Sequence, residues 1–95
     1  MKSLLTLLLL SVSSTTFSQE SSKTVYQDRI SSLTAKIAQE PSNLALYYAR
    51  ADAYDVLDKF EQSNLDYLKI TELYRRNPDA KYAGEFTKSC YRLAD

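Results

Sequence analysis

The chain has 95 residues, 44% of them hydrophobic and 25% charged, and its 12 Lys and Arg balance its 12 Asp and Glu. Positively and negatively charged residues are interspersed along the sequence. This argues against a basic stripe that binds nucleic acid and against a polybasic surface that binds membranes. The absence of histidine argues against an enzyme, and the single cysteine, Cys90, excludes an internal disulfide.

The N-terminal residues 1–18 have the three parts of a secretory signal peptide. A basic start at Lys2 is followed by an apolar run over 4–10 and by a cleavage region with small residues. We expect cleavage between Ser18 and Gln19. The apolar run is shorter than the roughly 20 residues of a membrane-spanning helix, so we expect no stable membrane anchor. The sequence therefore predicts an exported protein, periplasmic or secreted.

The polar residues 19–23 predict a flexible N-terminus ahead of a helical domain over 24–95. Thr24 with Gln27 fits a capping box at the start of a first helix, which we expect to end at about residue 40, before Pro41. Apolar residues at steps of four, three and four give this helix one buried stripe: Tyr26, Ile30, Leu33 and Ile37.

A second helix is predicted over 44–57, with Ser42 or Asn43 as its N-cap. Asp58 in the following turn tolerates a left-handed backbone better than most non-glycine residues. The core stripe of this helix comprises Leu44, Tyr47, Ala51, Tyr54 and Leu57, with the small Ala51 allowing close helix approach.

A third helix is predicted over 60–76, and Asn77-Pro78 separates it from a fourth over 80–94 that Asp79 caps. The third helix has its stripe at Phe60, Ser63, Tyr67, Ile70 and Tyr74, and the fourth at Phe86, Cys90 and Leu93. The position of Cys90 in this apolar stripe favours its burial, and an intermolecular disulfide is the alternative. No segment predicts a strand, so we expect an all-α, antiparallel array of about four helices.

Residues 44–78 resemble one tetratricopeptide repeat. Aromatic residues stand at Tyr47, Tyr54, Phe60 and Tyr67, small residues at Ala51 and Ser63, and a proline at Pro78. An offset of 37 residues also aligns Ile30 with Tyr67, Leu33 with Ile70, Pro41 with Pro78 and Tyr54 with Tyr91. Three positions depart from the pattern: Asp58 replaces glycine, Ile70 replaces a small residue, and Gly84 replaces an aromatic. The last predicts a closing cap for the fourth helix.

The resemblance implies a scaffold that binds a protein or peptide in a groove lined by first helices. The corresponding residues are Ala45, Tyr48, Asp52 and Asp55, whose acidic pair beside a tyrosine suits a basic or amphipathic partner. A solvated polar face is the alternative interpretation of these positions. We expect no catalytic residue, cofactor or metal site. The alternative function is structural self-association into a homo-oligomer through the incomplete ends of the array.

Overall fold

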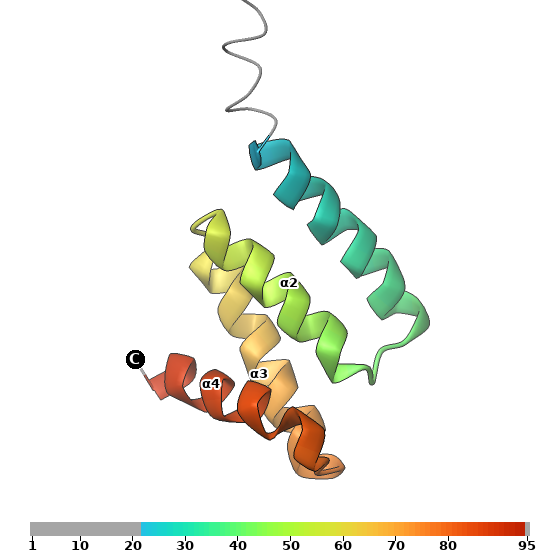
Figure 1. Ribbon diagram of the computed structural model, residues 1–95, viewed down its shortest axis with the longest axis vertical. Helices are drawn as coiled ribbons and strands as arrows, with labels where there is room; N and C mark the ends of the chain where they lie inside the picture. The colour runs from blue at the N-terminus through green and yellow to red at the C-terminus, as the bar shows by residue number, and fades with distance from the viewer. Residues whose placement is uncertain (1–21, 95) are drawn as a thin grey trace, which may run out of the picture.

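The computed structural model describes residues 22–94, which form an all-α array (Figure 1). An N-terminal helix over 22–39 is followed by α2 (Leu44–Val56) and α3 (Phe60–Arg76), and a 3-10 turn (Ala80–Tyr82) leads into α4 (Ala83–Ala94). The N-terminal helix lies beside α2 and runs in the opposite direction, α3 returns along α2, and α4 packs across α3 (Figure 1). The described residues contain no strand.

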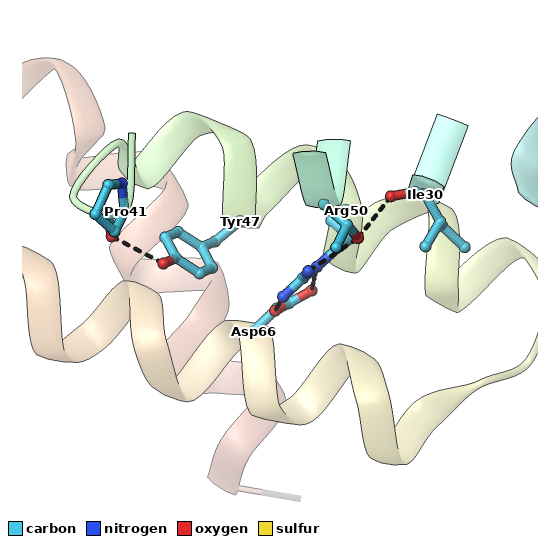
Figure 2. A network of polar contacts seen from close by, with 6 residues as sticks. Ile30, Pro41, Tyr47, Arg50 and Asp66 are labelled. Carbon is cyan, nitrogen blue, oxygen red and sulfur yellow. Dashed lines mark hydrogen bonds and ion pairs between the residues drawn. The ribbon is translucent and has the colours of Figure 1, made fainter. Parts of the chain in front are cut away.

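The loop between the N-terminal helix and α2 is fixed by two side chains. Asn43 is the N-cap of α2, because its side-chain oxygen accepts a hydrogen bond from the Ala45 amide at 3.2 Å. The Tyr47 hydroxyl donates to the Pro41 carbonyl oxygen at 2.8 Å (Figure 2). These bonds satisfy polar groups that the turn would otherwise leave unpaired, and they confirm Asn43 as the cap.

The turn between α2 and α3 depends on a left-handed residue, as the sequence predicts. Asp58 has φ of 57°, and within residues 22–94 it is the one non-glycine residue with positive φ. The Asp58 amide donates to the Asp55 carbonyl oxygen at 3.0 Å and the Lys59 amide to the Tyr54 carbonyl oxygen at 2.9 Å. This pair of bonds is a Schellman motif, which satisfies the last carbonyl groups of α2 and reverses the chain.

The core lies between α2 and α3, and its centre is the small residue Ala51, which has no solvent exposure. The buried cluster consists of Leu44, Tyr47, Ala51, Tyr67, Ile70 and Leu73, and four half-buried residues pack against it: Ile37, Tyr48, Tyr74 and Tyr82. Ile37 comes from the N-terminal helix and Tyr82 from the 3-10 turn, so both of these segments add to the core between α2 and α3. The central place predicted for Ala51 is confirmed.

The apolar stripes extend beyond the buried surface at their ends. Phe60 is 50% exposed, so its predicted core position was wrong. Tyr91, which the 37-residue offset aligns with the half-buried Tyr54, is 75% exposed. Cys90 is half-buried and Leu93 is exposed, because the stripe of α4 turns out of the interface toward its end. The buried residue of α4 is Ser89. Periodicity identifies a helix face, but only a covering helix buries it.

Element boundaries differ from expectation at both ends of the array. Residues 22 and 23 are already helical, so Thr24 lies inside the helix and not at its start. Asp79 is the N-cap of the fourth helical segment, as predicted, and its side chain accepts a hydrogen bond from the Lys81 amide at 3.1 Å. The first turn of that segment is a 3-10 turn and not α-helix.

The predicted signal peptide, residues 1–18, lies outside the described residues. None of the helices within 22–94 has the length and apolarity needed to cross a membrane.

Candidate functional site

The four residues expected to line a groove belong to α2, but they differ in what surrounds them. Ala45 and Asp52 are exposed, whereas Tyr48 and Asp55 are half-buried. The expectation of two solvent-facing acidic groups one turn apart therefore holds for Asp52 and not for Asp55. The difference arises because long side chains from α4 reach over Tyr48 and Asp55.

Asp55 is the centre of a network that joins three helices. The Arg92 guanidinium of α4 donates to both carboxylate oxygens, at 2.7 and 3.0 Å, and the Tyr67 hydroxyl of α3 donates to one of them at 2.8 Å. Burial raises the pKa of Asp55, but side-chain hydrogen bonds from Ser63, Tyr67 and Arg92 outweigh it and hold the pKa below its usual value. Burial, and then the hydrogen bond to Asp55, raise the pKa of Tyr67. Asp55 is therefore a carboxylate at neutral pH, and Tyr67 a neutral donor.

Aromatic rings complete this network. The rings of Tyr48 and Tyr67 meet edge to face, with centroids 6.4 Å apart. The Lys88 ammonium lies 5.2 Å from the Tyr48 ring centroid, and the Arg92 guanidinium carbon lies 5.3 Å from that of Tyr67. We call this group, which comprises Tyr48, Asp55, Tyr67, Lys88 and Arg92, the Asp55 site. It combines a carboxylate with two ring faces, an arrangement that binds cations.

A second network, which the sequence analysis missed, joins the N-terminal helix, α2 and α3 (Figure 2). Arg50 donates to both oxygens of the buried Asp66, at 2.9 and 2.6 Å, and a third bond runs to the Thr34 hydroxyl at 3.1 Å. The hydrogen bond to Asp66 raises the pKa of Arg50 above its ordinary value, against the lowering effect of burial. The available sequence signal was an acidic residue on the buried side of α3, three residues after Ser63 and four before Ile70.

Two of the shallow hollows on the described surface include none of Ala45, Tyr48, Asp52 and Asp55. One lies along α4 and is lined by Ala83, Gly84, Thr87, Lys88, Tyr91 and Arg92. A Cβ built on Gly84 would meet no atom within 4 Å, so this face is open. The other lies along α3, where Leu68 is flanked by charged residues.

Within residues 22–94, no group of acidic, cysteine or histidine side chains is arranged to hold a metal ion. Searches against family models, curated proteins and solved structures return no match to this chain. The candidate site therefore rests on the geometry of the Asp55 site and of the exposed side of α2 beside it.

Proposed function

We propose that this protein is a tetratricopeptide-like interaction module that binds a segment of another protein without catalysis. The observation that supports the proposal most is the Asp55 site, where aromatic, acidic and basic side chains from three helices converge beside exposed Ala45 and Asp52. Polar groups at this density on a helical scaffold suit recognition of a charged peptide segment. The exposed carboxylate of Asp52, beside this site, favours a basic or amphipathic partner.

Site-specific photocrosslinking tests this function. A photoreactive amino acid at exposed Ala45 reports on the proposed face, and the same group at exposed Asn64 of α3 is the matched control. We expect Ala45 to yield a discrete crosslinked protein that Asn64 does not capture, and the capture to weaken in an Asp52→Lys background. Equal capture at both positions, or none at either, would refute the proposed binding face.

Export is part of the proposal and rests on residues 1–18. If the signal peptide is removed, the protein recovered outside the cytoplasm begins at Gln19. N-terminal sequencing and intact mass measure this directly. Recovery of the full chain in the cytoplasm, beginning at Met1, would contradict it.

Self-association is the second candidate, favoured by the open outer face of α4 and the exposed Tyr91. Lys88 opposes it, because it stands 37 residues after Ala51, which is fully buried in the core between α2 and α3. A helix packed on α4 in the same way would enclose the Lys88 ammonium. Sedimentation at several concentrations separates the two functions: a mass that rises with concentration, and falls to that of one chain on Tyr91→Ser, indicates self-association.

A further inference from the structure

The outer side of α3 carries an apolar stripe that no described helix covers. Leu65 is 68% exposed and Leu68 is 55% exposed, and their spacing of three places them on the same side of the helix. Charged residues continue this side toward both ends of α3 at steps of three or four. We call the set the α3 stripe, and its exposed members are Glu61, Leu65, Leu68, Glu72, Arg75 and Arg76.

The hollow along α3 lies on this stripe and has the form of a hole that receives one side chain of a facing helix. Its lining comprises Leu68, Thr71, Glu72, Arg75 and Arg76. The first four have the spacing i, i+3, i+4 and i+7, which surrounds a single side chain when two helices interdigitate. A leucine on a facing helix fits such a hole, and the α3 stripe itself supplies one at Leu65.

The charges of the α3 stripe determine which direction a second α3 can take. Glu61 lies in the first turn of the helix, and Arg75 and Arg76 lie in the last turn. A parallel pair would bring like charges together at both ends, whereas an antiparallel pair brings each acidic end against a basic end. The antiparallel pair also sets opposite ends of the two helix dipoles side by side. A second copy of this chain is therefore complementary to the stripe.

We propose that the α3 stripe is a homodimer interface, in which α3 packs antiparallel on α3 of a second copy. Leu65 of each copy fills the hollow of the other, between Thr71 and Glu72. This register places Leu68 of one copy beside Leu68 of the other, close to the two-fold axis. Each contact occurs twice because the interface is symmetric, and the dimer is closed.

The same register pairs the charges. Glu61 stands four residues before the leucine that fills the hollow, and Arg75 and Arg76 stand four residues after the centre of the hollow, so they lie opposite each other. Within the described part of the chain, Glu61 forms no ion pair. Arg76 donates to Glu72 at 2.6 Å, and the guanidinium carbon of Arg75 lies 5.8 Å from the Phe86 ring centroid. A guanidinium has five N–H donors, so both arginines can keep these contacts and also donate to Glu61 of the other copy.

This interface is separate from the Asp55 site and from the open face of α4. None of the residues of the Asp55 site belongs to the α3 stripe, so the dimer carries two copies of that site. One 17-residue helix from each copy, about 25 Å long, forms a small interface, so association is weak. We therefore expect single chains at micromolar concentration and dimers at higher concentration.

Sedimentation equilibrium of the full chain between about 10 μM and about 1 mM tests the dimer. We expect the mean mass to rise from that of one chain toward that of two and no further. Leu68→Asp brings two carboxylates together at the axis, and it should weaken association by about a hundredfold or more. Val25→Asp, which changes a 50% exposed residue outside the stripe, is the matched control and should leave the masses unchanged. Tyr91→Ser should also leave them unchanged, because Tyr91 belongs to α4.

A charge exchange tests the register without altering the apolar residues. Glu61→Arg sets arginine against arginine, and the double variant Arg75→Glu, Arg76→Glu sets glutamate against glutamate, so neither should self-associate. An equimolar mixture of the two proteins restores both oppositely charged contacts. It should form a mixed dimer with an affinity within about tenfold of that of the parent.

Three results overturn the inference: a single-chain mass for the wild type at every concentration, association unaffected by Leu68→Asp, or folded charge variants that do not associate on mixing. Circular dichroism measures the helix content of each variant, and the charge exchange decides the outcome if Leu68→Asp does not fold. Asn64 borders the stripe, so crosslinking from it should yield a second copy of this chain. Crosslinking from Ala45 tests the proposed function independently, because Ala45 lies on α2, outside this interface.

Discussion

Breaking the Arg50–Asp66 pair should cost more than breaking any exposed ion pair of the array. Asp66 is buried, with a side-chain exposure of 4%, and both of its oxygens accept from Arg50, which also ties in the N-terminal helix through Thr34. Arg50→Met leaves this carboxylate without its cation. Breaking a fully buried pair costs about 3–5 kcal/mol, and the partial exposure of Arg50 reduces the expected loss to about 2–3 kcal/mol.

Urea unfolding followed by circular dichroism measures this loss, and thermal melts should shift by roughly 10–20 °C for a domain of this size. Arg76→Met is the matched control, because its bond to Glu72 is exposed and should contribute less than about 0.5 kcal/mol. A double variant, Arg50→Met with Asp66→Leu, should recover to within about 1 kcal/mol of the parent, since it leaves no buried charge. The reasoning is refuted if Arg50→Met costs no more than Arg76→Met, or if the double variant is no more stable than Arg50→Met.

Three other predictions concern the core, the turn and the Asp55 site. Ala51→Leu should lower the free energy of unfolding by about 1–3 kcal/mol because the site is full, whereas Ala45→Leu on the exposed side should change it by less than about 0.5 kcal/mol; similar urea midpoints would contradict this packing. Asp58→Gly should raise stability by up to about 1 kcal/mol, and Asp58→Val should lower it by about 1–2 kcal/mol, because φ is positive there; the opposite order in thermal melts would rule out the left-handed turn. The lowered pKa of Asp55 means that its stabilising contribution is fully present above the unfolded value of about 3.9 and is lost as pH falls through the folded value. The stability difference between the parent and Asp55→Asn should therefore shrink between about pH 5 and pH 2, and a constant difference in urea titrations across that range would count against the network.

Signals that act within a few residues predicted the fold well. Asn43, Asp58 and the two prolines determine their turns through local backbone chemistry, so α2 and α3 have nearly the expected boundaries. The exposure of Phe60 and Tyr91 could not be predicted in the same way. Phe60 follows the stripe of α3 and Tyr91 follows the 37-residue repeat, but no described helix covers either residue. Periodicity does not show whether a neighbouring helix is present.

The candidate site was predicted only in part, because its contacts join residues far apart in sequence. Arg92 and Asp55 are 37 positions apart, and Arg50 and Asp66 are 16 apart. The resemblance to a tetratricopeptide repeat pointed to the side of α2 that bears Tyr48 and Asp55. It could not show that long side chains from α4 cross to that side, because their direction depends on how α4 packs against α3.

We propose that a partner binds this protein through the carboxylate of Asp55. Calorimetric titration of the segment recovered by crosslinking at Ala45 tests it most directly, with the wild type, Asp55→Asn and Glu72→Gln as a control on the far side of α3. We expect Asp55→Asn to weaken binding by about tenfold or more, and Glu72→Gln to leave the Kd unchanged. The same Kd for all three proteins would contradict it.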